Sequence, residues 1–435
     1  MEAVKVVLIS TYDLGRQPFG LASPAAWLRA EGHDVEMADL SRGPLPLAAV
    51  EQADVVAFYV PMHTATRLAL RAIERVRDEN PRARLCAYGL YAPLNEEALR
   101  RAGVEAAIGG EFERSLVDWV GRAVPPAISL ARQNFLVPDR ADLPPLAAYA
   151  QLAVNGSRRV VGYTEASRGC KHLCRHCPIV PVYRGVFRIV QPEIVLEDIR
   201  RQVAAGAQHI TFGDPDFFNG PGHAVKIVEA LHHEWPSLTY DVTIKIEHLL
   251  RHRGLLPVLA RTGCAFVTSA VESLDDAVLE KLAKHHTRAD FEEALRLTRE
   301  AGVPLSPTFI PFTPWTTRES YRDFLRAMVE LDLAGQAPPI QLAIRLLIPR
   351  GSLLLDLQDV QGIVEPFDAE ALLYPWRHPD PAVDGLATAV QKIVQREKRE
   401  AFRRVWDLAE AGPWPVDAPM LDRATIPYLT EPWYC

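Results

Sequence analysis

Cysteine is scarce in this chain, with only six residues in 435. Three of them, Cys86, Cys264 and Cys435, are isolated along the sequence, and the first two lie in apolar, strand-like runs. Such sparse spacing gives no sign of the disulfide framework that small secreted domains use. We therefore expect Cys86 and Cys264 to be small residues of the hydrophobic core.

Long apolar runs and blocks of one charge are also absent. No stretch approaches the ~20 apolar residues that a membrane-spanning helix needs. The net charge of −7 and the lack of a basic run argue against nucleic acid as the main partner. The chain enters a strand-like run directly after Met1, without the regions of a secretory signal. These absences predict a cytoplasmic protein that acts on a small molecule, without membrane or nucleic-acid partners.

The remaining three cysteines, Cys170, Cys174 and Cys177, form one local pattern, C-x3-C-x2-C. Thiolates hold iron–sulfur clusters, and three of them leave one iron of a [4Fe–4S] cluster without a protein ligand. An open iron suits catalysis better than simple electron transfer. A structural zinc site completed by His172 or His176 is the alternative, but no second C-x2-C knuckle occurs.

The cysteine loop resembles that of the radical S-adenosylmethionine (SAM) superfamily. The resemblance rests on the spacing, on His176 just before the last cysteine, and on the strand-like run at 159–164 ahead of the loop. It implies a [4Fe–4S] cluster on Cys170, Cys174 and Cys177, SAM on the open iron, and His176 beside the cofactor. It also implies an external electron donor such as flavodoxin or ferredoxin.

The chain divides into four regions, and the α/β fold class follows from their patterns. Residues 1–120 alternate short apolar strands with amphipathic helices, as in a Rossmann-like doubly wound domain. Residues 121–157 are rich in proline and are predicted to be a linker. Residues 158–350 alternate again and resemble the partial (β/α)6 barrel of radical SAM enzymes, with strands expected at 159–164, 208–213, 240–245, 264–271, 304–310 and 340–347. Residues 351–435 form a helical and proline-rich extension, with one helix expected at 387–410.

The first domain resembles the cobalamin-binding domains that precede many radical SAM barrels. The matching runs are 19–29, 32–35, 53–56 and 110–113. The Asp-x-His-x-x-Gly motif that supplies a cobalt ligand is absent, so cobalamin binding and loss of the cofactor both remain open. The candidate cofactor-binding residues of this domain are Tyr12, Gly20, Met62, Gly89, Gly110 and Glu111. His63 follows a predicted strand and is interpreted as an incidental loop histidine.

Further candidates lie where the radical SAM family binds SAM. The resemblance implies that Gly213, with Asp214 or Asp216, holds the SAM amino group, although an Asx-Pro turn is the structural alternative. It implies that Glu272 or Ser273 contacts the ribose or the carboxylate. It also implies that the backbone near Pro349 holds the adenine, while Arg345 and Arg350 are candidates to bind a carboxylate or to be surface arginines.

The remaining polar and aromatic residues of the barrel are interpreted by position. Lys284 is predicted to cap its own helix. Glu165 and Arg168 are predicted to form a structural ion pair ahead of the cluster loop. Residues that follow the third and fifth predicted strands are candidates to line the substrate pocket: Lys245, Glu247, Thr308, Phe309 and Phe312.

Cys435 is the last residue of the sequence. One radical SAM subfamily with a cobalamin-type domain ends in Cys followed by Cys or selenocysteine and Ala-Glu-Pro. The resemblance suggests a catalytic Cys435 followed by a selenocysteine codon read as a stop. A vicinal pair of this kind would suit a soft or metalloid acceptor such as arsenic.

The predicted function is reductive cleavage of SAM and radical modification or alkylation of a small molecule, with cobalamin-assisted methyl transfer as one form. The alternative is transfer of a 3-amino-3-carboxypropyl group to a soft or metalloid acceptor, without cobalamin.

Overall fold

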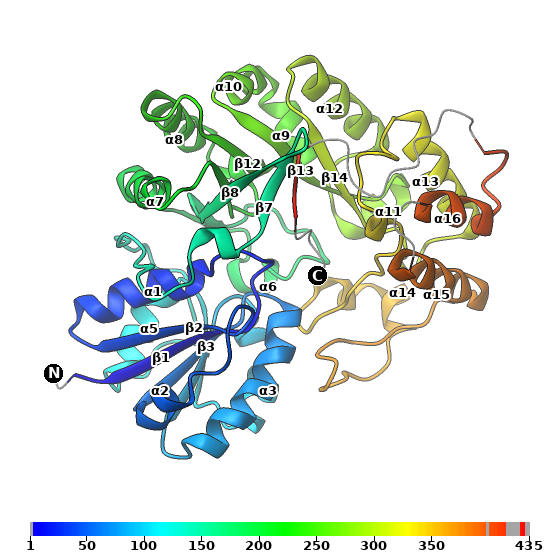
Figure 1. The fold of residues 1–435 in the computed structure, drawn as a ribbon. Helices are drawn as coiled ribbons and strands as arrows, with labels where there is room; N and C mark the ends of the chain where they lie inside the picture. The colour runs from blue at the N-terminus through cyan, green and yellow to red at the C-terminus, as the bar shows by residue number, and fades with distance from the viewer. Residues whose placement is uncertain (1–2, 397–399, 415–426, 431–435) are drawn as a thin grey trace.

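The computed structural model describes residues 3–396, 400–414 and 427–430, and two large sheets organise them, the first parallel and the second mainly parallel (Figure 1). The first sheet has the strand order β2-β1-β3-β4-β5-β6, and all its neighbours are parallel. Its strands are β1 (Lys5–Ser10), β2 (Asp34–Asp39), β3 (Val55–Tyr59), β4 (Arg84–Tyr88), β5 (Ala106–Gly110) and β6 (Ile128–Ser129). The order reverses between β1 and β3, and ligands of such sheets bind at the carboxyl ends of the strands at this point.

Helices cover both faces of the first sheet. One face packs on α1 (Phe19–Ala30) and α5 (Phe112–Val120), and the other on α2 (Leu47–Gln52), α3 (His63–Glu79) and α4 (Glu96–Arg101). Because both faces are covered, β3 is buried along its whole length, which explains its continuous apolar sequence. The Rossmann-like fold predicted for this region is confirmed.

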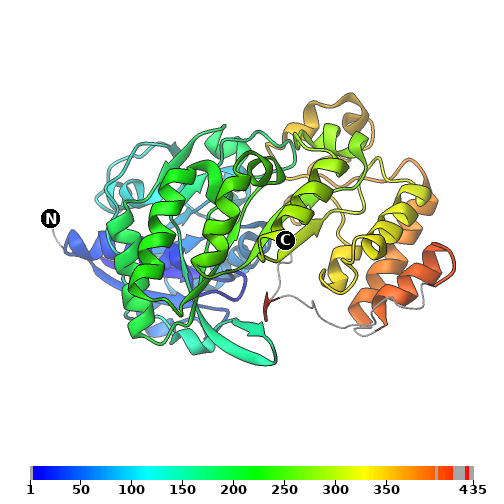
Figure 2. The ribbon, with the colours of Figure 1, turned by 90° about the horizontal axis from the view of Figure 1, so that it is seen from above.

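The second sheet is a curled half-barrel with the order β14-β13-β12-β11-β8-β7-β15. Five of its strands are parallel: β8 (Ser157–Thr164), β11 (His209–Phe212), β12 (Thr239–Thr243), β13 (Cys264–Glu272) and β14 (Leu305–Phe309). Helices line its outer side (Figure 2): α7 (Pro192–Ala204), α8 (Pro221–Glu234), α9 (Ile246–Arg251), α10 (Leu256–Arg261), α11 (Asp276–Leu282), α12 (Arg288–Glu300) and α13 (Arg318–Glu330). Cys86 and Cys264 are buried within the two sheets, as predicted.

The sixth barrel strand, expected at 340–347, is not formed. A short 3-10 helix (Pro339–Leu342) occupies the start of this run, and a single parallel bridge joins Phe312 to Arg345. Proline has no amide hydrogen for a strand ladder, and Pro338 and Pro339 precede the run.

The proline-rich stretch 121–157 contributes to both sheets. It supplies β6 to the first sheet and β7 (Gln151–Val154), which pairs antiparallel with β8. The distant β15 (Tyr428–Leu429) pairs with β7 and covers its edge. Leu429 then packs on Leu152, Val161 and Phe266.

The C-terminal extension lies at the end of the barrel away from the N-terminus (Figure 2). In place of the one helix expected at 387–410 it contains α15 (Pro381–Arg396) and α16 (Ala401–Ala409), preceded by the short α14 (Gln358–Gln361). The predicted catalytic residue Cys435 lies outside the described residues. None of the helices in the described parts combines the length and apolar character needed to cross a membrane.

Candidate active site

The cysteine loop lies at the carboxyl edge of the half-barrel, between β9 (Ser167–Gly169) and α6 (Val180–Tyr183). Gly169 has a φ of +73°, and an added Cβ would lie 2.3 Å from the Tyr183 ring, so the entry to the loop requires glycine. Cys170, Cys174 and Cys177 are free thiols. Burial, together with the nearby Cys174 and Cys170, raises the pKa of Cys177 to about 12. Burial and then Asp216 and Cys174 raise the pKa of Cys170.

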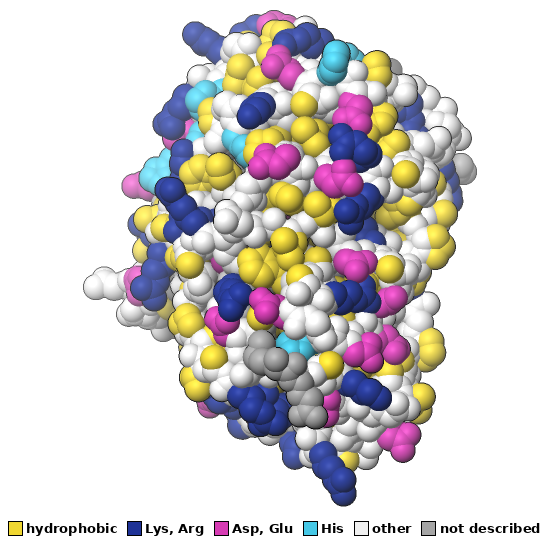
Figure 3. All heavy atoms as spheres, turned by 90° about the vertical axis from the view of Figure 1, so that its left-hand side faces the viewer, with side chains coloured by type: hydrophobic (Ala, Val, Ile, Leu, Met, Phe, Trp, Pro, Cys, Tyr) yellow, Lys and Arg dark blue, Asp and Glu magenta, His cyan; other side chains and the backbone are white. Residues whose placement is uncertain are grey.

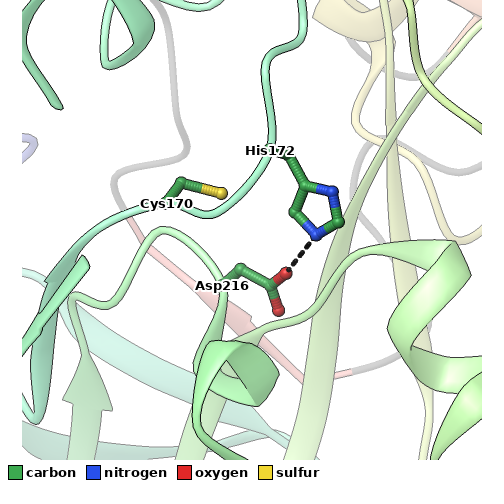
Figure 4. Close-up of side chains that lie close together, drawn as sticks. All are labelled: Cys170, His172 and Asp216. Atoms are coloured by element: carbon green, nitrogen blue, oxygen red, sulfur yellow. Dashed lines mark ion pairs between the residues drawn. The ribbon is translucent and has the colours of Figure 1, made fainter. Parts of the chain in front are cut away.

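A cluster of histidines and carboxylates anchors the first half of the loop. Figure 4 shows the His172 ring directed at the Asp216 carboxylate, with Cys170 beside them. His172 Nε2 lies 3.5 Å from Asp216 Oδ2, and His248 Nδ1 lies 2.7 Å from the same oxygen. Burial opposes ionisation of Asp216, but the hydrogen bonds from His172 and His248 lower its pKa to about 2. Asp216, predicted to contact SAM, thus holds the loop.

A second anchor holds the end of the loop. His176 Nε2 lies 3.1 Å from Glu272 Oε1, and Lys284 Nζ lies 3.4 Å from the same oxygen. Burial opposes ionisation, yet Lys284 and His176 together lower the pKa of Glu272 to about 2. Glu272 has a φ of +71°, a strained conformation of the kind found at functional sites. The prediction that Lys284 caps its helix is wrong, because its ammonium is buried on Glu272.

A third anchor comes from the first domain. The guanidinium of Arg168, two residues before Cys170, is buried and contacts Glu113 at 2.6 Å, Glu165 at 2.6 Å and Glu111 at 3.6 Å. The predicted Glu165–Arg168 ion pair is therefore confirmed. Burial raises the pKa of Glu111 to about 7, even though the charge of Arg168 opposes this rise. The loop is thus attached to both domains.

Among the candidates near β11, Asp214 and Gly213 have local partners. Asp214 accepts hydrogen bonds from the Ala166 amide at 2.9 Å and the Ser167 hydroxyl at 2.6 Å. Burial raises its pKa to about 7. A Cβ on Gly213 would lie 1.7 Å from the Tyr163 hydroxyl, so glycine allows that close approach.

Ser273 and the later candidates lie around the ends of β13 and β14. Ser273 lines a cavity of about 150 Å³ together with Pro311 and Thr316. Arg345 is paired with Asp384 at 2.6 Å and stacks on Trp376, so a carboxylate of the chain already occupies it. Pro349 is buried, and its carbonyl accepts a hydrogen bond from the Ser352 amide at 3.2 Å.

The expected pocket lining is only partly correct. Phe309 and Phe312 are fully buried in the core beneath the outer helices, where Phe309 contacts Phe291 and Phe324 and Phe312 stacks on Tyr321. Lys245 instead lies in the site, with its Nζ 3.7 Å from Cys174 Sγ. The sequence analysis did not identify His248 or Glu113. The one feature of the sequence that could have indicated these two residues is their position, because each follows a parallel strand by a few residues.

The donor set of the cysteine loop fits a [4Fe–4S] cluster. Cys170, Cys174 and Cys177 are free thiols of one loop, and ligand atoms of Cys170, His172 and Asp216 lie within 4.8 Å of one another. The ammonium groups of Lys245 and Lys284 partly oppose the rise in the pKa of Cys170 and Cys177 respectively. Buried thiols with raised pKa values ionise readily only on a metal, and iron–sulfur clusters bind thiolates.

The residues predicted to bind a cofactor in the first domain do not fit cobalamin as they are packed. At the carboxyl edge of the first sheet, Met62 belongs to a buried apolar cluster that we call the edge cluster. Tyr12 packs against it. The buried members of the edge cluster, two of which come from α6, are Leu14, Met62, Ala65, Tyr91, Leu94, Val182 and Tyr183. A Cβ on Gly20 would lie 2.2 Å from the Tyr59 ring, and one on Gly89 would lie 3.1 Å from it, so Tyr59 fills the space before both glycines. A Cβ on Gly110 would lie 2.2 Å from the Ser129 carbonyl oxygen, so that position is also filled. His63 contacts the Ala371 carbonyl at 2.6 Å.

Comparison with known proteins places the barrel. Residues 164–328 match the family model described as the radical SAM superfamily. A hopanoid C-3 methylase of Methylococcus capsulatus is 27% identical over 151 residues, 35% of this chain and 29% of that protein. A tRNA-2-methylthio-N(6)-dimethylallyladenosine synthase of Desulfosudis oleivorans is 30% identical over 181 residues, 40% of this chain and 38% of that protein. The matches thus span less than two fifths of the length of these relatives.

One solved structure shares the fold over most of the chain. The cobalamin-dependent SAM radical enzyme OxsB, with aqua-cobalamin bound, aligns with a TM-score of 0.68 and 16% identity over 91% of this chain and 67% of its own. The chain contains a radical SAM domain within the same overall fold.

Proposed function

We propose that this chain, a radical SAM enzyme by the domain it contains, uses Cys170, Cys174 and Cys177 to hold a [4Fe–4S] cluster and cleaves SAM reductively to modify a small molecule. When bound, the cluster supplies the electron that breaks a carbon–sulfur bond of the sulfonium, leaving a thioether and a carbon radical. The observation that carries the proposal is the convergence of three separate anchors on one cysteine loop.

The chain's own residues hold and orient the loop. Asp216 fixes His172, Glu272 fixes His176, and Arg168 fixes the residues before Cys170. Holding reactants in a fixed geometry accounts for much of the rate of a reaction that needs few acid–base groups. The cavity beside Ser273 is the proposed SAM subsite. Asp214 and Gly213 follow β11, which β12 separates from β13 in the sheet.

The test is anaerobic reconstitution with iron and sulfide, followed by SAM, dithionite and mass spectrometry of the nucleoside products. We expect 5′-deoxyadenosine from the wild type and none from Cys174→Ala. Cys264→Ala, which alters a buried cysteine outside the loop, is the matched control and should keep the product. Methylthioadenosine would instead indicate transfer of a 3-amino-3-carboxypropyl group. Equal products from wild type and Cys174→Ala would refute the proposal.

Methyl transfer is a second candidate, favoured by the shared fold. OxsB is described with aqua-cobalamin, and the methyltransferase TsrM of Kitasatospora setae aligns with a TM-score of 0.64 and 17% identity over 81% of this chain and 75% of its own. Cobalamin binding at this edge would require α6, with Val182 and Tyr183, to separate from the other members of the edge cluster. Incubation with hydroxocobalamin, gel filtration and absorbance spectroscopy test this: retained corrin supports the candidate, and free corrin removes it.

The distribution of surface charge indicates which kinds of partner the protein has. On the face that Figure 3 presents, basic and acidic side chains are interspersed rather than gathered into one basic patch. This favours a small-molecule substrate, served by an electron donor such as flavodoxin or ferredoxin.

We also propose Cys435 as a catalytic residue, because β15 joins the chain just before it to the barrel sheet. Cys435→Ser should keep the cluster absorbance and lose substrate turnover.

A further inference from the structure

We propose that Lys245 sets the reduction potential of the cluster by placing a buried positive charge against the ligand Cys174. Lys245 follows β12 and enters the site from the barrel wall, and only 7% of its surface is exposed. Its Nζ donates to Cys174 Sγ over 3.7 Å. The inference rests on the proposed function, since it requires that Cys174 binds the cluster.

The charge of Lys245 is poorly balanced by its neighbours. Its closest carboxylate oxygen is Glu247 Oε2 at 3.9 Å, and the other oxygen of Glu247 accepts from Arg251 at 2.7 Å. Lys284, the other buried lysine of the site, has Glu272 at 3.4 Å. Of these two lysines, Lys245 has the more distant carboxylate and is the one whose ammonium contacts a cysteine sulfur.

Reduction adds one electron, and hence one negative charge, to the cluster. Hydrogen bonds to the sulfurs, net charge and solvent exposure set iron–sulfur potentials. In a buried site a nearby ammonium is little screened by water, so it favours the reduced form. Removing that charge should lower the potential and make the cluster harder to reduce.

The experiment is a dithionite titration of the reconstituted protein, followed by electron paramagnetic resonance of the one-electron reduced cluster. Lys245→Gln keeps an N–H donor without the charge, Lys245→Met removes both, and Lys245→Arg keeps the charge. Lys281→Gln is the matched control, because Lys281 is exposed and pairs with Asp359 at 2.7 Å. We expect at least a tenfold fall in the reduction equilibrium constant for Gln and Met, about 59 mV for one electron. Arg and the Lys281 control should stay near wild type.

The outcomes separate the two proposals. If the wild type binds no cluster, the proposed function fails. If the cluster forms and the Gln and Met variants titrate at the wild-type potential, the role of Lys245 is refuted while the function stands. If every Lys245 variant, Arg included, fails to assemble a cluster, Lys245 serves assembly and the redox role is likewise overturned.

Discussion

Arg168 is a single buried cation facing three carboxylates, Glu111, Glu113 and Glu165. Breaking a buried ion pair from one side costs about 3–5 kcal/mol, because the partner charges stay buried and uncompensated. We expect Arg168→Met to lose about that much free energy of unfolding in a denaturant titration. Arg200→Met, which removes an exposed arginine paired with Glu234, should change it by less than about 1 kcal/mol. Equal losses for the two variants would contradict this reading of the network.

Glu111 gives the same network a pH dependence. Burial raises its folded-state pKa from 4.5 to about 7. A raised pKa means that its contribution to stability is fully present below about pH 4.5 and is lost as the pH rises through about 7. Glu111→Gln mimics the protonated group, so it should match wild type at about pH 4 and be more stable at pH 8, by roughly 1–3 kcal/mol. The measurement is denaturant unfolding at both pH values, with the exposed Glu51→Gln as control; a variant that is no more stable at pH 8 would contradict it.

At the scale of single residues, the sequence indicated candidate site residues more readily than it indicated the partners of those residues. The three cysteines were recognisable because their spacing is local. Arg345 was a candidate to bind a carboxylate of SAM or substrate, or to be a surface arginine, and in the structure it pairs with Asp384 on α15. Asp216 was assigned to SAM, while its partners His172 and His248 come from a separate loop and helix. Contacts between residues far apart in sequence leave no local pattern.

At the scale of elements, apolar periodicity located the parallel strands because it reflects burial on both faces. Apolar periodicity failed to predict the structure where the amino-acid composition of a run and its actual strand pairing disagree. The run at 340–347 is apolar enough for a strand, but the prolines before it favour a 3-10 turn. Conversely, the proline-rich 121–157 was predicted to be a linker and still supplies β6 and β7. β6 is the edge strand of its sheet, where such a context is tolerated, and β7 contains no proline.

The pairing of β15 with β7 makes an element-scale prediction. Leu429 is 9% exposed and packs on Leu152, Val161 and Phe266, far away in sequence. Leu429→Ala should lower the free energy of unfolding by about 2–4 kcal/mol, because it removes buried methyl groups and leaves a cavity. Denaturant titration measures this, with the half-exposed Leu47→Ala as control. A loss no greater than that of the control would mean that β15 does not close the barrel sheet.

At the scale of the molecule, several contacts join the first domain to the rest, and three of them show the range of types. Arg168 crosses to Glu113, Val182 and Tyr183 of α6 pack into the edge cluster, and Arg350 pairs with Glu97 at 2.7 Å. The sequence predicted two separate domains, with candidate cofactor-binding residues at the edge of the first. The structure uses that edge to hold the cysteine loop, so the two domains should behave as one folding unit.

Met62→Asp tests that unity. Met62 is 8% exposed in the edge cluster, and an unpaired carboxylate buried there costs several kcal/mol unless the surfaces part. We expect wild type to unfold in one calorimetric transition and Met62→Asp to unfold in two, as the domains lose their coupling. Leu68→Asp, at a 39% exposed position of α3, should keep the single transition. If Met62→Asp instead melts in one transition at a lower temperature, the edge cluster stabilises the first domain without linking it to the barrel.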